Sequence, residues 1–233
     1  MSRLKWLLLV PVVLIVLIVG GTWLYINVIR EDPPERLSLE DSSSSDDSTP
    51  AAGDETAASG EVEGEWTIGA GSIAGYRVDE VRLGQGLEAV GRTEDVTGTM
   101  SITGTAVEEA SFEVDLTTLE SDEGLRDGQV QSRILETGEF PTATFELTEP
   151  IDLGELPADG EVATLEATGD LTVHGETQPV TFELDAQREG SAINVNGLVP
   201  LTWADFGIDD PSGGPNDVEQ AGEMEFLLVF EAA

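Results

Sequence analysis

The sequence predicts an all-β domain that follows a membrane anchor and a flexible spacer. Three observations predict it: an uncharged apolar run at residues 6–29, a stretch at 30–63 rich in Ser, Asp, Glu, Pro and Ala, and alternating apolar and polar residues from Gly64 onward. Alternation with a period of two is typical of strands with one buried and one wet face. We therefore divide the chain into 1–29, 30–63 and 64–233.

The apolar run WLLLVPVVLIVLIVGGTWLYINVI is long enough to cross a membrane as a helix. At about 1.5 Å per residue it spans a hydrocarbon core of about 30 Å with some tilt. Arg3 and Lys5 precede the run, so the positive-inside rule predicts a cytoplasmic N-terminus and an extracytoplasmic domain. A cleaved signal peptide is the alternative, but its apolar region is normally shorter and no clear A-x-A-like site follows. We expect a single-pass anchor in the cell membrane.

The spacer at residues 30–63 lacks aromatic residues and has few large apolar ones. Such a composition cannot bury enough surface to offset the entropy lost on ordering. Its acidic residues repel one another and extend the chain. We expect a disordered acidic linker between the membrane and the folded domain.

The alternation from Gly64 onward predicts antiparallel strands. ASFEVDLTT places Phe112 and Val114 on one face and Glu113 and Asp115 on the other. The same pattern recurs in TATFELT, ATLEATGDLTVHG, PVTFELDA, INVNGLVPLT and GEMEFLLVFE, with glycine and acidic turns between them. Short turns favour hairpins, and about eight or nine such strands curl into a sandwich or close into a barrel. Closure removes exposed strand edges.

Two segments interrupt the alternation. SDEGLRDGQVQSRILETGEF, at residues 121–140, predicts a short helix that ends near Gly138. ADFGIDDPSGGPNDVEQAG, at residues 204–222, contains several turn formers and predicts a long loop.

Small residues on the inward face leave space inside the predicted barrel. Glycine and alanine occupy positions 74, 75, 98, 143, 167 and 169. An eight-stranded barrel has room for its side chains or for one slender ligand. Trp203 and Phe206, at the start of the long loop, are candidate residues of the barrel mouth. The other candidate ligand contacts face inward by strand parity: Tyr76, Val78, Met100, Phe112, Val114, Phe145, Leu171, Val173, Phe182, Leu184, Ile193, Val195, Met224, Phe226, Leu228 and Phe230. The alternative is that these residues form a solid, dry core.

The composition excludes several kinds of partner and site. The formal net charge is −37, and from residue 61 to the end 38 acidic residues face 6 arginines. Such a surface repels nucleic-acid phosphates and anionic lipid headgroups. The chain has no cysteine and a single histidine, so disulfides, thiolate chemistry and an ordinary zinc site are disfavoured. We expect no metal, no cofactor and no nucleic-acid partner.

No catalytic group stands out. His174 shares the polar parity of Thr172 and Asp170 and falls at a hairpin turn, so we expect it to face solvent. GAGSIAG, at residues 69–75, is not a G-x-G-x-x-G loop, and Ser72 is not in a G-x-S-x-G elbow. We predict no catalytic residue, although abundant acids keep a hydrolase as a minor alternative.

An acidic cluster in the long loop is the one candidate for a cation. Asp209, Asp210, Asn216, Asp217 and Glu219 offer oxygen ligands of the kind that calcium prefers. The spacing of an EF-hand is absent, and acids are common throughout the domain. We expect a structural loop, with calcium as the alternative.

The motifs, taken in order, resemble the YceI-like family. SIAGYRV resembles its S-x-V-G-F-x-V stretch, and VGRTEDVTGTMSI resembles V-x-G-R-F-x-x-F-x-G-x-I. EFPTATFEL resembles the segment around Y-P-x-I-T-F, and GDLTVHGETQPVTFEL is similar to G-D-L-T-I-x-G-x-T-x-P-V-x-L-x-V. WADFGID resembles the x-D-F-G-L segment before the last strand. The resemblance covers nearly all of residues 64–233.

The resemblance implies a lipocalin-like, eight-stranded antiparallel barrel with a helix closing one end, which holds an isoprenoid or other long-chain lipid in its lumen. Two family histidines are missing: Gly71 stands where one precedes S-x-V-G-F, and RDGQVQS lacks the one in R-D-x-H-L. The function expected is binding, storage or transport of an amphiphilic isoprenoid or quinone-type lipid, without catalysis. The alternative is a structural or interaction domain with a filled barrel. The oligomeric state stays open.

Overall fold

The computed structural model describes residues 16, 20–21, 33–43, 62–82, 84–154, 157–214 and 216–233. The chain forms two compact units, Met1–Pro34 and Glu35–Ala233, and the second contains the β domain. The predicted anchor at residues 6–29 lies outside the described residues except at positions 16, 20 and 21. No helix among the described residues is both long enough and apolar enough to span a bilayer.

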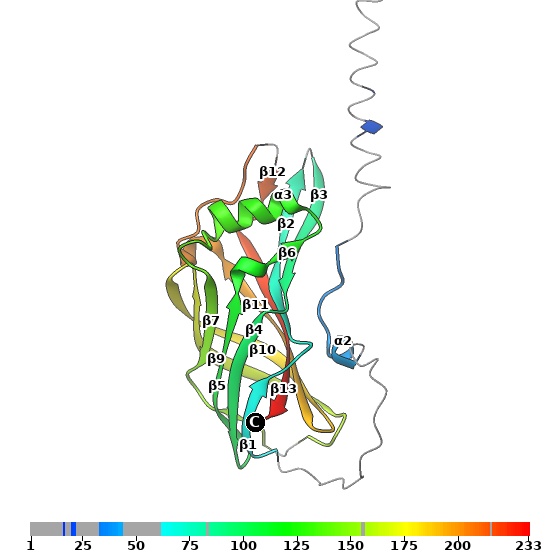
Figure 1. Ribbon diagram of the computed structural model, residues 1–233, viewed down its shortest axis with the longest axis vertical. Helices are drawn as coiled ribbons and strands as arrows, with labels where there is room; N and C mark the ends of the chain where they lie inside the picture. The colour runs from blue at the N-terminus through cyan, green and yellow to red at the C-terminus, as the bar shows by residue number, and fades with distance from the viewer. Residues whose placement is uncertain are drawn as a thin grey trace, which may run out of the picture. The chain divides into compact units, whose positions relative to one another are not determined.

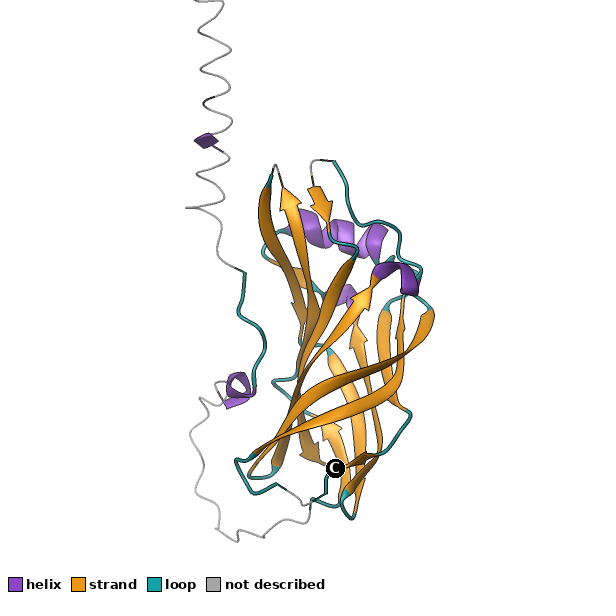
Figure 2. Ribbon diagram, turned by 180° about the vertical axis from the view of Figure 1, so that it is seen from behind, coloured by secondary structure: helices purple, strands orange, loops and turns teal. Residues whose placement is uncertain are grey.

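Within the described residues, eight antiparallel strands close into a barrel (Figures 1 and 2). The prediction of an all-β, closed antiparallel barrel is therefore confirmed. The ring closes where residues 66–68 of the first strand pair with residues 230–232 of the last. In ring order the strands are β1 (Gly64–Ile68), β4 (Val96–Thr103), β5 (Ala106–Asp115), β7 (Thr142–Leu147), β9 (Val162–Val173), β10 (Glu176–Glu189), β11 (Ala192–Thr202) and β13 (Ala221–Ala232).

The remaining strands extend the barrel wall at one end. β2 (Ile73–Arg82) continues along the edge of β13 beyond the point where β1 ends, and β3 (Gln85–Thr93) pairs with β2. Three short strands complete the sheet: β6 (Glu120–Ser121) on β3, β12 (Asn216–Val218) on β2 and β8 (Ile151–Asp152) on β5. The wall is therefore longer on the β2 side than on the β1 side.

The GAGSIAG segment contains the link between β1 and β2, residues 69–72, and the first three residues of β2. Ser72 is buried, and its hydroxyl donates to the carbonyl oxygen of Gly69 at 3.0 Å and accepts from the Val229 amide at 2.9 Å. Gly71 has a φ of 87°, in the region that favours glycine. The segment therefore turns the chain from one strand to the next along β13.

The helix predicted over residues 121–140 is confirmed in position and is shorter than that window. α3 (Gly124–Gln129) continues as one wider π-helical segment, η3 (Val130–Ile134), and a turn follows at Glu136. The helix lies across one end of the barrel (Figures 1 and 2). Two 3₁₀ turns, η2 (Leu116–Thr118) and η4 (Trp203–Phe206), stand at strand ends, and β12 lies in the predicted long loop.

Part of the predicted flexible spacer is ordered against the barrel wall. Residues 35–43, which end in the short helix α2 (Leu39–Ser43), lie over β13, β11 and β10. The Leu37 carbonyl oxygen accepts from Asn196 Nδ2 at 2.9 Å, and Leu37 itself is buried. This differs from the expectation of a disordered linker because the partners of the segment are on distant strands, where spacer composition does not reveal them. Residues 44–61 lie outside the described part of the chain.

Candidate functional site

Two cavities formed by the described residues lie inside the barrel, toward opposite ends of its axis. The first, of about 190 Å³, lies beneath α3, and the second, of about 110 Å³, lies toward the end where β1 and the C-terminus stand. The first is lined mainly from β2, α3 and η3, together with Trp203 of η4. The second is lined mainly by aliphatic and phenylalanine side chains of β4, β5, β10, β11 and β13.

Most of the predicted lumen residues line one of the two cavities. Those at the first cavity are Tyr76, Val78, Val114, Val173, Trp203 and Met224. Those at the second are Met100, Phe112, Phe145, Phe182, Leu184, Ile193, Val195, Phe226, Leu228 and Phe230. Leu171 and Phe206 are buried and line neither. The strand parity read from the sequence thus identifies the inward face, and the structure divides that face into two spaces.

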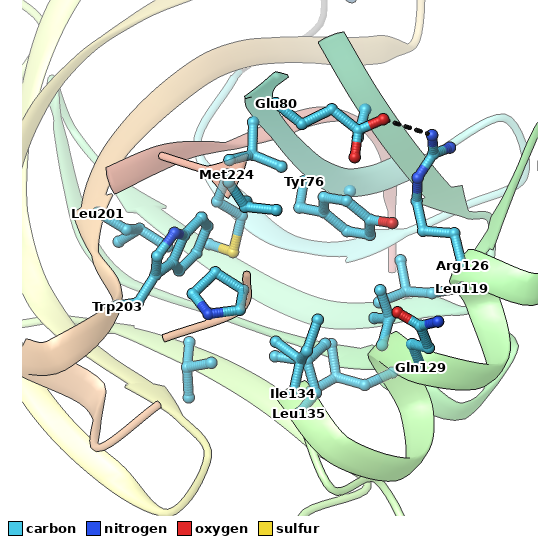
Figure 3. Close-up of a pocket in the computed structure, with 18 of the residues that line it drawn as sticks. Tyr76, Glu80, Leu119, Arg126, Gln129, Ile134, Leu135, Leu201, Trp203 and Met224 are labelled. Atoms are coloured by element: carbon cyan, nitrogen blue, oxygen red, sulfur yellow. Dashed lines mark hydrogen bonds and ion pairs between the residues drawn. The ribbon is translucent and has the colours of Figure 1, made fainter. Parts of the chain in front are cut away.

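Tyr76 carries the polar group that points into the first cavity (Figure 3). Its ring packs over Gly91 of the paired strand, where a Cβ would stand 2.4 Å from Tyr76 Cε1. The hydroxyl is buried and has no hydrogen-bond partner among the described residues. Burial raises the pKa of Tyr76 above its ordinary value, so the phenol is a neutral hydrogen-bond donor at physiological pH.

A charged cluster stands beside Tyr76 at the α3 end of the first cavity. Arg126 Nη2 lies 3.3 Å from Glu80 Oε1, and Arg82 Nη1 lies 2.9 Å from Glu123 Oε2 (Figure 3 shows the first pair). Arg126 also contacts the carboxylate of Asp122. The hydrogen bond from Arg82 to Glu123 raises the pKa of that arginine. Both guanidinium groups are therefore neutralised by carboxylates.

Several residues at the first cavity were not predicted from the sequence. Glu80 and Arg82 share the inward parity of Tyr76 and Val78 on β2, so alternation alone would have placed them at the lumen. They were left out because only apolar and aromatic residues were taken as lumen candidates. Others come from residues 119–135, which contain α3 and η3 and whose orientation over the barrel is a tertiary feature. The missed residues of that segment include Leu119, Glu123, Leu125, Arg126, Gln129, Val130, Ile134 and Leu135.

The two positions of the missing family histidines have different surroundings. Gln129, which takes the histidine position of the R-D-x-H-L pattern, lines the first cavity. Gly71 stands in the turn between β1 and β2 and lines neither cavity. Only the first substitution therefore changes the chemistry of the lumen.

His174 does occupy the turn between β9 and β10, but its side chain is largely covered instead of facing solvent. The residue has a left-handed φ of 53° and its side chain is 12% exposed. Its Nε2 lies 3.1 Å from Glu136 Oε2, and its Nδ1 lies 3.3 Å from the Phe206 carbonyl oxygen. The ring also packs on Phe140. The left-handed turn redirects the side chain, which fastens the end of the helical segment to η4.

The acidic loop is organised by its own hydrogen bonds. Asp210 Oδ1 accepts from the Ser212 amide at 2.9 Å and from Gln220 Nε2 at 3.0 Å. The hydrogen bond from the Ser212 backbone amide lowers the pKa of Asp210. No group of three or more potential metal-ligating side chains occurs in the part of the chain that the structure describes.

A closed antiparallel barrel with apolar internal cavities belongs to the class of small β-barrels, whose interior is filled by side chains or holds one slender ligand. Residues 66–230 match the YceI-like domain, and the chain belongs to this family. It is 32% identical over 150 residues to a UPF0312 protein of Pseudomonas syringae, covering 60% of this chain and 71% of that protein. It is 33% identical over 102 residues to a UPF0312 protein of Vibrio parahaemolyticus, covering 41% of this chain. The chain spans only 50% of the length of that Vibrio relative.

Solved structures show the same fold. A polyisoprenoid binding domain from Saccharophagus degradans, implicated in plant cell wall breakdown, aligns with a TM-score of 0.59 and 20% identity over 72% of this chain and 98% of its own. BcnA of Burkholderia cenocepacia aligns with a TM-score of 0.51 and 19% identity over 66% of this chain and 95% of its own. At these identities the likeness concerns the architecture of the barrel.

Proposed function

We propose that the domain binds an amphiphilic isoprenoid with an uncharged oxygen-bearing head, of quinone or alcohol type, and stores or carries it without chemical change. The observation that carries the proposal is the hydroxyl of Tyr76, which is buried at the polar end of an apolar cavity and has no hydrogen-bond partner in the described part of the chain. Unpartnered buried donors cost free energy unless a ligand or water satisfies them. The Saccharophagus domain of the same fold, described as polyisoprenoid-binding, supports the choice of ligand class.

The lining of the lumen suits an apolar tail. Burial of each methylene contributes about 0.8 kcal/mol, so a few isoprene carbons provide a substantial driving force. The loss of tail freedom and of rigid-body freedom offsets much of it, so the affinity stays well below that sum. Because the apolar tail is buried inside the barrel, the acidic outer surface stays in contact with water.

The charges around Tyr76 favour a neutral head over a phosphate. Arg82 and Arg126 are each paired with carboxylates, so neither offers a free cation. The surrounding domain is strongly acidic and repels anions. A quinone carbonyl or an alcohol oxygen needs only a hydrogen-bond donor, which the neutral phenol of Tyr76 supplies.

We further propose that the domain stands outside the cytoplasm, held at the cell membrane by residues 6–29. The apolar run and the positive residues before it support this location. A tether would keep the barrel mouth close to the bilayer in which an isoprenoid resides. Cell fractionation tests the membrane location. Digestion by protease added to intact cells, compared with permeabilised cells, tests on which side of the membrane the domain lies.

The ligand test uses the full chain purified from its own host in a mild detergent. Native mass spectrometry with organic extraction should show one apolar adduct that carries a quinone or alcohol head. Tyr76→Phe, which removes the hydroxyl and keeps the ring, should weaken binding of that ligand about tenfold, the value of one hydrogen bond of roughly 1.4 kcal/mol. The exposed Glu183→Gln on the outside of β10 is the control and should bind as the wild type does. A clean apo mass and no uptake of added quinones or polyprenols would reject the proposal in favour of an interaction domain.

A further inference from the structure

Four phenylalanine rings form a closed cycle across the middle of the barrel. Phe112 packs on Phe145 with ring centroids 5.3 Å apart, Phe145 on Phe182 at 5.5 Å, Phe182 on Phe226 at 5.9 Å, and Phe226 on Phe112 at 5.6 Å. The rings come from β5, β7, β10 and β13. We call these four residues the Phe quartet.

The Phe quartet lies on the boundary between the two cavities. The sets of residues that line the cavities share no member. On β5, β7 and β13, consecutive inward residues divide between them: Val114, Ala143 and Met224 line the first cavity, while Phe112, Phe145 and Phe226 line the second. Leu171, at the same level on β9, is fully buried and lines neither. The interior is therefore divided by a packed layer.

Two glycines let the rings of this layer reach the wall. A Cβ on Gly169 would stand 2.4 Å from Phe145 Cζ, and a Cβ on Gly197 would stand 2.5 Å from Phe226 Cζ. Because both rings lie directly over glycine backbone, they fill the space that an inward side chain would otherwise take. The rings of Phe112 and Phe182 are not among the nearest contacts of any described glycine, and each packs against two neighbouring rings of the cycle.

The size of each space limits what fits without moving the layer. Neither cavity reaches the roughly 300–1,000 Å³ typical of sites that enclose a drug-sized ligand. At about 30 Å³ for each water-sized group, the first cavity holds roughly six such groups. That space accepts about one isoprene unit with the head beside Tyr76, and a longer tail meets the quartet.

We propose that the Phe quartet is a septum that limits the length of the isoprenoid tail that the barrel binds tightly. This inference rests on the proposed lipid-binding function and deepens it by naming the residues that set tail-length specificity. A short-tailed amphiphile fills the first cavity with the septum closed. A longer tail enters the second cavity only after the Phe112 and Phe182 rings turn aside, and the disrupted ring contacts offset the extra burial.

The test measures binding of isoprenoid alcohols with one, two, three and four isoprene units to the full chain in nanodiscs, corrected for partition into empty nanodiscs. In an undivided lumen each added unit buries several methylenes and strengthens binding more than tenfold. For the wild type we expect the affinity to stop rising after the first unit, because a longer tail meets the quartet. In Phe182→Leu, which opens the septum, it should rise through the fourth.

Phe140→Leu is the matched control because Phe140 packs on His174 and lines neither cavity. It removes the same volume and should keep the wild-type length profile. Phe112→Leu serves as the second septum variant if thermal melting shows that Phe182→Leu is unfolded. An unbroken rise in wild-type affinity through four units, or the same profile change in both Phe182→Leu and Phe140→Leu, would overturn the septum while leaving lipid binding in place. Binding of no alcohol by any folded variant would overturn both.

Discussion

Arg77 Nε donates to the carboxylate of Glu225 at 3.2 Å, and both side chains are buried on the outer wall of the barrel. Arg92 Nε reaches the same carboxylate at 2.8 Å. The carbonyl oxygen of Glu35, in the ordered part of the spacer, accepts from both arginines. A charged network is thus covered by a segment that composition assigned to a free linker.

Removal of the shared carboxylate should destabilise the barrel strongly. Glu225→Ala removes the carboxylate that the buried Arg77 shares with Arg92, although Glu88 still contacts Arg77, and the loss of one partner of a buried ion pair costs up to about 3–5 kcal/mol. Arg36→Ala is the control, because its ion pair with Glu223 is exposed and is worth at most about 1 kcal/mol. Urea unfolding of both variants measures the difference. An equal decrease in the free energy of unfolding for the two variants would show that the buried network stabilises the fold no more than a surface ion pair does.

Release of the ordered spacer segment should expose it to protease. Leu37→Asp puts a charge at a buried apolar position and forfeits roughly 1.5–3 kcal/mol of burial. We expect faster cleavage within residues 35–43 in limited proteolysis, with the barrel itself still resistant. Glu40→Gln, at an exposed position of α2, should be cleaved at the wild-type rate. Unchanged cleavage of Leu37→Asp would contradict the docking of this segment.

The close approach of Tyr76 to Gly91 makes that glycine sensitive to a single methyl group. Gly91→Ala forces the Tyr76 ring away from β3, and overpacking of this kind costs typically about 1–3 kcal/mol. Affinity for the neutral-headed ligand should fall as the hydroxyl moves. Gly86→Ala on the same strand meets no neighbour within 4 Å and is the matched control. Calorimetry of both variants tests stability, and ligand titration tests the position of the hydroxyl.

Alkaline pH should weaken the fold through Tyr76. Because burial raises its folded-state pKa above the ordinary value of about 10, the unfolded chain loses this proton first as pH rises. The contribution is complete below about pH 10 and is lost as pH rises from there through the folded pKa. Wild-type unfolding free energy should therefore fall more between pH 9 and pH 11 than that of Tyr76→Phe. Parallel pH profiles for the two proteins would contradict the shift.

Strand parity predicted the inward face of the barrel well. Phe112, Phe145, Phe182 and Phe226 were all identified from alternation alone, because a strand with one buried face shows its orientation in every second residue. His174 was placed at the correct turn, but its exposure was wrong. The left-handed backbone at that turn directs the ring toward Glu136 and Phe206, and these partners are distant in sequence.

The alternation in the amino-acid sequence was enough to predict the all-β class, the antiparallel strands, the helical insertion and the side of each strand that faces the lumen, whereas the choice of a barrel over a sandwich rested on edge closure and on the family resemblance. Local periodicity specifies these features because each side chain needs only its own strand to show which way it points. Three features emerged from the tertiary structure: the Phe quartet divides the lumen, the Tyr76 hydroxyl has no hydrogen-bond partner among the described residues, and residues 35–43 lie on the wall. These features depend on contacts between residues far apart in the chain, whose register no local pattern records.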